Sequence, residues 1–257
     1  MSDYDRNVAA FPGARAGQSV AVDAGLRAHM LRVYNYMAGA VGLTGVVAWL
    51  TYQASGGDAI RVVGRGAMTG LTPFGEMVMG GYSPIILMLA TLGLVFFISV
   101  RINRLQYTTA FGLFMLYAAL LGAALSTIFV QYTGTSITQV FFISAASFGA
   151  LSLYGYTTQR DLSPFGAFLI MGLFGVIIAM IVNIWLASSA LAFAISVVGV
   201  LVFAGLTAWD TQKIKEMYDV NDDGTVAGRK AVMGALTLYL DFINLFLMML
   251  RLFGDRR

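Results

Sequence analysis

Seven long apolar runs dominate the pattern of hydrophobic and polar positions along the chain. Each holds close to 20 residues with few charges, the length that a helix needs to cross the ~30 Å hydrocarbon core of a bilayer. Barrel strands would instead alternate apolar and polar residues over about 9–11 positions. The pattern therefore predicts an all-α bundle with seven membrane-spanning helices, at about residues 31–53, 85–102, 108–131, 137–157, 165–186, 190–209 and 231–252.

The segments outside these runs are too small to fold separately. Residues 1–28 are polar and lack the apolar stretch of a secretory signal, so they are expected to form a flexible cytoplasmic tail. Residues 54–84 are rich in glycine and are expected to form a long loop. The chain shows no fixed-period repeat, which leaves residues 29–257 as a single transmembrane domain.

Composition supports a membrane protein and excludes several kinds of chemistry. Hydrophobic residues make up 58% of the chain and charged residues only 11%, against about one quarter charged in soluble domains. The net charge of +3 comes without clustered basic residues beside aromatics, which argues against a nucleic-acid partner. The absence of cysteine excludes thiolate metal sites and a cysteine nucleophile, and the single histidine, His29, cannot supply a zinc site by itself. We expect no enzyme activity and no cofactor.

Basic residues near the ends of the runs predict the orientation, because they concentrate on the cytoplasmic side of membrane proteins. An N-terminus in the cytoplasm places on that side Arg27, Arg32, Arg101, Arg104, Arg160, Lys213, Lys215, Arg229 and Lys230. Between the runs, only Arg61 and Arg65 then lie outside. A full seventh crossing would also put Arg251, Arg256 and Arg257 outside, against the rule. The sequence leaves open whether the last run crosses or re-enters.

The most informative polar position is Asp241, inside the apolar run LTLYLDFINLFLMML. It lies about 15 Å along that predicted helix at 1.5 Å per residue, near the middle of the bilayer. An ionisable group at this depth is costly and indicates a functional site with a partner. Asp210, at the end of the sixth run, is the comparable acid, although Lys213 is also placed to pair with it on a helix. Asn244 shares a helical face with Asp241 and is expected to support it.

Two carboxylates in one poorly hydrated site should not both be ionised. At about 4 Å their repulsion is about 4 kcal/mol at an effective dielectric constant near 20, so they are expected to share one proton. Protonated, the pair would close a passage through a hydrogen bond. Deprotonated, it would repel itself or transiently bind a divalent cation, and carboxylate oxygens suit calcium. Arg251, or Arg101 and Arg104, are candidates to neutralise one charge in the closed state.

The connection before the last run contains DVNDDG (219–224), which begins like an EF-hand calcium loop. The twelfth position of such a loop needs a bidentate glutamate, and here it would be Lys230. A solvated turn is the better interpretation.

Three stretches resemble the Bax inhibitor-1 family, specifically its bacterial branch. They are GLTAWDTQKIKEMY (205–218), GALTLYLDFINLFLMMLRLFG (234–254) and a middle stretch that begins SITQVFFISAASFGALSLYGY (136–156) and extends to residue 185. The resemblance implies seven helices with the last at the centre, in a bacterial inner membrane. It also implies a pH-sensitive calcium leak governed by an aspartate pair, which falls on Asp210 and Asp241, with Arg251 at the position of a gating arginine. The longer loop around residues 219–224 departs from the family and leaves its role open.

Two other functions compete with the leak channel. The first is a membrane-embedded regulator that binds a membrane protease or a stress-response protein, a role that the resemblance to some bacterial members of the family implies. Intramembrane aspartyl proteases also use two aspartates on adjacent membrane helices as their catalytic residues. Those enzymes carry a Gly-x-Gly-Asp motif at the second acid, whereas Leu238, Tyr239 and Leu240 precede Asp241 here, so the flexible glycines are missing.

Overall fold

The structure, a computed structural model, describes residues 12–63 and 67–257. Within these residues, seven helices are long and apolar enough to cross a membrane, which confirms the predicted spans. They are α1 (Pro12–Ala54), α3 (Ser83–Arg101), α4 (Tyr107–Leu125), α6 (Gly134–Thr157), α7 (Ser163–Leu186), α8 (Ser189–Glu216) and α9 (Gly224–Phe253). Short elements connect them: η1 (Gly57–Ala59), β1 (Arg61–Val63), β2 (Ala67–Thr69), α2 (Pro73–Met79), η2 (Ile102–Arg104) and α5 (Ile128–Gln131).

Local chemistry sets where several helices begin and end. Pro164 occupies the first turn of α7, where its missing N–H costs nothing. Ala187 ends that helix in a left-handed conformation with φ 46°, and the Ser188 side chain then accepts a hydrogen bond from Leu191 N at the start of α8. Asp223 caps α9 in the same way, so that helix begins seven residues before the apolar run does.

The first helix is longer than the sequence predicted. Residues 1–28 were expected to form a flexible tail, but α1 begins at Pro12 and continues without a break into the first span. Residues 1–11 lie outside the described part of the chain. After Pro12 no proline interrupts the segment before the span, and alanine and other helix-compatible residues outnumber Gly13, Gly17 and Gly25, so the helix of the span extends in the N-terminal direction.

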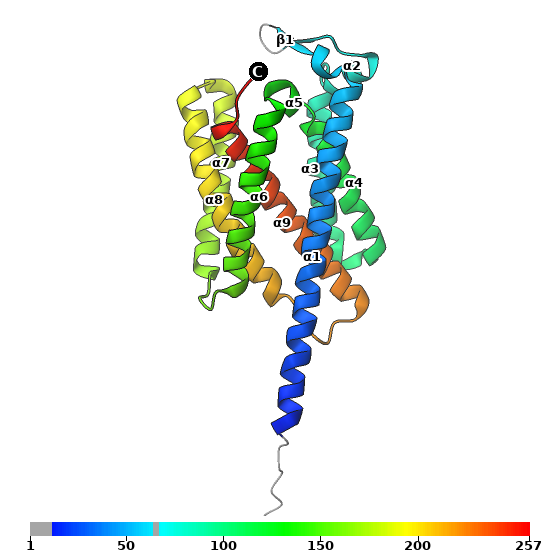
Figure 1. Ribbon diagram of the computed structural model, residues 1–257, viewed down its shortest axis with the longest axis vertical. Helices are drawn as coiled ribbons and strands as arrows, with labels where there is room; N and C mark the ends of the chain where they lie inside the picture. The colour runs from blue at the N-terminus through cyan, green and yellow to red at the C-terminus, as the bar shows by residue number, and fades with distance from the viewer. Residues whose placement is uncertain (1–11, 64–66) are drawn as a thin grey trace, which may run out of the picture.

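Two groups of three helices enclose the last helix (Figure 1). Helices α6, α7 and α8 pack together on one side, and α1, α3 and α4 on the other. Helix α9 runs obliquely between the groups and packs against α1, α4, α6 and α8. It is largely buried, whereas the other six spans expose most of their residues as lipid-facing helices do. The last helix is therefore central, as expected, and it runs from one end of the bundle to the other rather than turning back.

The start of α1 and the end of the chain lie at opposite ends of the bundle (Figure 1). We call the end with the α6–α7 and α8–α9 connections the N-terminal face. The opposite end, with the β1–β2 hairpin, α5 and the last residues, is the C-terminal face.

The last residue is tied to the C-terminal face by three hydrogen bonds. Arg257 donates from Nη1 to Asp58 Oδ1 at 2.9 Å and to the Tyr52 hydroxyl at 3.1 Å, and its backbone N–H donates to the carbonyl of Gln131 at 3.0 Å. These bonds connect the end of α9 to the loop after α1 and to α5. The end of the central helix is thereby fixed relative to its neighbours.

The Asp58 contact should depend on pH and on the carboxylate itself. Hydrogen bonds from Arg257 and Tyr52 lower the pKa of Asp58 below its ordinary value of 3.8. A lowered pKa means that the stabilisation is present at neutral pH and disappears as the pH falls through that lowered value. Asp58→Asn should reproduce this loss at neutral pH, with amide hydrogen exchange at Arg257 about twofold to fivefold faster, as expected for an exposed ion pair. Asp219→Asn, at the opposite face, is the control, and equal exchange in both variants would exclude the contact.

Candidate functional site

The two membrane aspartates meet across the contact between α8 and α9. Asp210 is 8% exposed and Asp241 is 5% exposed, and their carboxyl groups face each other closely enough to interact. Oδ2 of Asp241 is buried without a hydrogen-bond partner in the described part of the chain. Two ionised carboxylates have no proton to donate to each other, so this contact becomes a hydrogen bond only when one of the pair is protonated.

The sequence places Asp210 near the membrane surface and Asp241 near the middle of the bilayer, and the length of α8 helps to explain how the two acids can meet. The apolar run ends at residue 209, which would place Asp210 at the membrane surface. Helix α8 instead continues to Glu216, about 9 Å beyond Asp210 at 1.5 Å per residue. Helix α9 also runs obliquely between the two groups of helices (Figure 1), so each residue along it advances less along the long axis of the bundle than in an upright helix. The longer α8 and the tilted α9 together account for the meeting of the two carboxyl groups.

Polar side chains after Asp210 hold this extension of α8 against its neighbours. Gln212 is buried; its Oε1 accepts from Leu162 N at 2.8 Å and its Nε2 donates to the carbonyl of Arg160 at 2.9 Å. Lys215 donates from Nζ to the carbonyl of Tyr156, also at 2.9 Å. These bonds satisfy backbone groups of the α6–α7 connection that would otherwise be unpaired. They explain why the helix passes beyond the end of the hydrophobic pattern.

A chain of hydroxyl groups runs beside the pair from α1 to α8. The Tyr34 and Ser152 hydroxyls are 2.6 Å apart, and Ser152 and Thr211 are 2.9 Å apart. Thr211 follows Asp210 and also bonds the carbonyl of Thr207 at 2.7 Å. Sequence reasoning missed these groups, because isolated serine and threonine residues in apolar runs are common. Their importance becomes visible only when the helices are in place, because Ser152 and Thr211 are then both buried.

Two glycines let α6 and α7 approach α8 next to Asp210. A Cβ atom at Gly155 would lie 2.1 Å from the carbonyl oxygen of Ala208, and one at Gly166 would lie 2.2 Å from the Trp209 ring. Close approach of backbones through small residues is typical of membrane helix packing. The contacts fix the two residues that precede Asp210 and so contribute to its position.

Gly155→Ala should therefore destabilise the protein, by about 1–3 kcal/mol, because the added methyl group meets backbone that cannot move independently. Gly149→Ala, on the same helix, is the matched control, since no described atom lies within 4 Å of its added Cβ. That control should be neutral or stabilising by up to about 1 kcal/mol through helix propensity. Thermal unfolding in detergent compares the two, and equal melting temperatures would contradict a close α6–α8 contact.

The charged surroundings of the pair are sparse. Asp210 is the charged neighbour of Asp241, and Lys213 acts electrostatically on Asp210. Lys213 does not form an ion pair with Asp210 among the described residues; its Nζ lies 5.0 Å from the centre of the Trp209 ring. The simple interpretation of Asp210 as half of a surface ion pair is therefore not what the structure shows.

The structure does not bring the candidate arginines to the aspartates. Arg251 lies near the other end of α9, where its Nη1 is 3.8 Å from the Met180 sulfur. Arg101 and Arg104 are exposed at the N-terminal face, and no ion pair joins either to an acid within residues 12–63 and 67–257. Asn244 donates to the carbonyl of Leu240 in its own helix at 2.8 Å rather than to Asp241.

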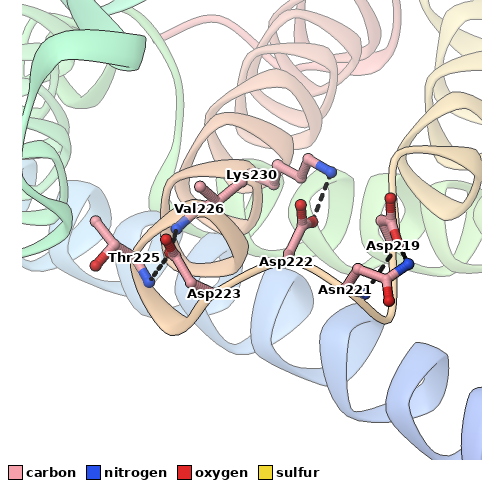
Figure 2. A network of polar contacts seen from close by, with 7 residues as sticks. All are labelled: Asp219, Asn221, Asp222, Asp223, Thr225, Val226 and Lys230. Atoms are coloured by element: carbon pink, nitrogen blue, oxygen red, sulfur yellow. Dashed lines mark hydrogen bonds and ion pairs between the residues drawn. The ribbon is translucent and has the colours of Figure 1, made fainter.

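The acidic connection at 219–224 is held by local hydrogen bonds (Figure 2). Asp222 pairs with Lys230 at 2.5 Å, and Asp223 accepts from Thr225 N and Val226 N at 2.8 and 2.7 Å. Asp219 accepts from both nitrogens of Asn221, which lowers its pKa. These acids cap α9 and close the connection. Among the described residues no group of three or more histidine, cysteine or acidic side chains could hold a metal.

The chemistry available at the site is that of two carboxyl groups alone. Calcium binds six to eight oxygen ligands, and Asp210 and Asp241 provide at most four between them. The pair can therefore exchange a proton or contribute to a weakly held, partly hydrated cation. It lacks the ligands of a storage site.

Comparison with known proteins gives one family and several bacterial relatives. Residues 26–257 match the family described as inhibitor of apoptosis-promoting Bax1. The inner membrane protein YbhL of Escherichia coli is 44% identical over 245 residues, covering 95% of this chain and 98% of that protein. An uncharacterized protein of Rickettsia prowazekii is 47% identical over 235 residues, covering 91% of this chain and 92% of that protein. The similarity extends over nearly all of the part that forms the spans.

Proposed function

This chain belongs to the Bax inhibitor-1 family of membrane proteins, and we propose that it is a pH-sensitive calcium leak whose pathway is controlled by Asp210 and Asp241. The observation that carries the proposal is the contact between two buried carboxyl groups on adjacent helices. Buried ionisable groups in membrane spans are costly and concentrate on ion and proton pathways.

In this proposal, one proton decides whether α8 and α9 stay together near the N-terminal face. With a proton present, the carboxyl groups form a hydrogen bond that joins the helices. Without it, two negative charges face each other with about 4 kcal/mol of repulsion at 4 Å and an effective dielectric constant near 20. Separation of the helices then opens a passage beside α9, so flux rises with pH.

Calcium is the proposed permeant ion because the exposed ligands would be carboxylate oxygens, which suit a hard divalent cation. The other ligands would be water molecules. Incomplete coordination favours release, and a leak requires that the ion leaves as readily as it enters.

We place the N-terminal face in the cytoplasm. Arg27, Arg160, Lys213 and Lys215 lie at this face or in the helix turns next to it, as the positive-inside rule requires. The proton that the pair senses would then be cytoplasmic, since Asp210 lies near that end of α8. A bacterial inner membrane is the proposed location, as for the relative YbhL.

Calcium flux from purified protein tests the proposal. Liposomes that contain the protein and a calcium-sensitive dye should show a pH-dependent signal that empty liposomes lack. If the purified protein shows no flux at any pH, the leak is excluded. A stable protein partner recovered by crosslinking in cells would then favour a membrane-embedded regulator.

A further inference from the structure

The C-terminal face holds more positive charge than the proposed orientation favours. Arg251, Arg256 and Arg257 all lie at this end of the bundle, where basic residues are normally few. Arg257 is neutralised by Asp58. The other two arginines need a separate explanation.

Arg251 and Arg256 both line one cavity of about 500 Å³. Its lining comes from the α7–α8 turn, the end of α5 and the last residues of the chain, and Figure 1 shows these elements together at the C-terminal face. Arg251 and Arg256 thus lie at one cavity, which neither Asp210 nor Asp241 lines. The cavity does not overlap the site of Asp210 and Asp241.

In the part of the chain that the structure describes, neither guanidinium group has a carboxylate partner. Within residues 12–63 and 67–257, the ion pairs are Arg257 with Asp58 and Lys230 with Asp222. The side-chain contact of Arg251 is with the Met180 sulfur at 3.8 Å, which is a weak acceptor. Two cations at one cavity repel each other unless an anion lies between them.

Other groups in the lining can donate hydrogen bonds to such an anion. Asn183 uses its Oδ1 to accept from Ser188 N at 3.1 Å, which leaves its side-chain N–H groups available. The Ser188 oxygen accepts from Leu191 N, which leaves its O–H as a donor. Both residues line the cavity, together with Gln131. The cavity therefore presents two positive charges and several donors, and none of the described residues that line it is acidic.

We infer that this cavity binds a phosphate group. Arginine is the side chain best suited to phosphate, because its planar fork donates two parallel hydrogen bonds. Phosphate can come from the headgroup of an anionic phospholipid or from free phosphate. The lipid is the source that the position favours: Phe193, Ala187 and Ala192 also line the cavity at the ends of membrane spans, where acyl chains begin. Basic pockets between membrane helices bind anionic headgroups in the same way.

Two binding measurements on the purified full-length protein test this inference and identify the source. Native mass spectrometry compares retention of phosphatidylglycerol with that of phosphatidylcholine, and calorimetry measures inorganic phosphate. The test variant is Arg251→Gln with Arg256→Gln. The control is Arg61→Gln, which removes an arginine from β1 on the same face but outside the cavity.

We expect the double variant to bind the phosphate ligand about tenfold or more weakly, as expected for loss of charge-assisted hydrogen bonds. Arg61→Gln should bind as the original protein does. Arg251→Lys with Arg256→Lys should recover part of the affinity, because it keeps the charge but not the fork. If the double variant is poorly folded, each single glutamine variant should lose part of the affinity. The inference would be overturned if the glutamine variants bound phosphatidylglycerol and inorganic phosphate as tightly as the original protein does. It would also be overturned if the original protein bound neither probe.

Discussion

Replacing Asp241 by asparagine is expected to abolish the pH dependence of calcium flux. The amide cannot take up or release a proton, and it does not become a negative charge opposite Asp210. In the original protein, flux should rise with pH by up to about tenfold per pH unit where the shared proton is lost, which is the limit for one titrating proton. In Asp241→Asn the flux should be flat over the same range.

Glu216→Gln is the matched control for this prediction. Glu216 is an exposed acid on the same helix as Asp210, at its last turn. The substitution removes one carboxylate without touching the pair, so its pH profile should match that of the original protein. Asp210→Asn should behave as Asp241→Asn does, since either change removes the pair. Unchanged, pH-sensitive flux in both asparagine variants would exclude the pair as the sensor.

Replacing Tyr239 by alanine should have the largest effect on stability. Tyr239 is fully buried at the centre of α9; its ring contacts Phe114 and Tyr117 edge-on, and its hydroxyl lies 2.6 Å from the Thr44 hydroxyl. It therefore joins α9 to both α1 and α4. Removing a buried aromatic side chain costs about 3–5 kcal/mol.

Tyr239→Phe separates packing from hydrogen bonding. It keeps the ring and removes only the hydroxyl, and Thr44 still donates to the carbonyls of Ala40 or Ala118, both at 2.9 Å. Interhelical hydrogen bonds in membranes contribute about 0.6 kcal/mol on average, so this variant should be only slightly destabilised. Unfolding in mixed micelles compares the two. If both variants were equally stable, the central packing of α9 would be contradicted.

The hydrophobic pattern was sufficient to predict the spans, because lipid imposes length and apolarity on each helix separately. It could not predict where helices extend beyond the apolar run. The last turns of α8 are polar and are held by Gln212 and Lys215 through partners 50 to 59 residues away in the sequence. Such contacts depend on tertiary structure.

The aspartates were identified because each is rare in its surroundings, and their contact followed once both helices were placed. The sequence offered no comparable basis for choosing among the arginines, which are numerous at helix ends. Arg251 was a candidate gating residue by its place on α9, yet it lies at the opposite end of that helix from the Asp223 cap and lines a separate cavity. Resemblance to a family can assign a position on a helix, whereas side-chain contacts require the structure.

Protonation of the aspartate pair and calcium flux, measured together, test whether loss of the shared proton opens the pathway. Infrared spectroscopy detects the carbonyl stretch of a protonated carboxyl group, and it can be titrated with pH in the same liposomes that report calcium flux. One such band should disappear over the pH range in which flux rises, and the variant with both Asp210→Asn and Asp241→Asn should lack it. A rise in flux with no change in this band, or an unchanged titrating band in the double variant, would contradict a gate that opens when the aspartates lose their shared proton.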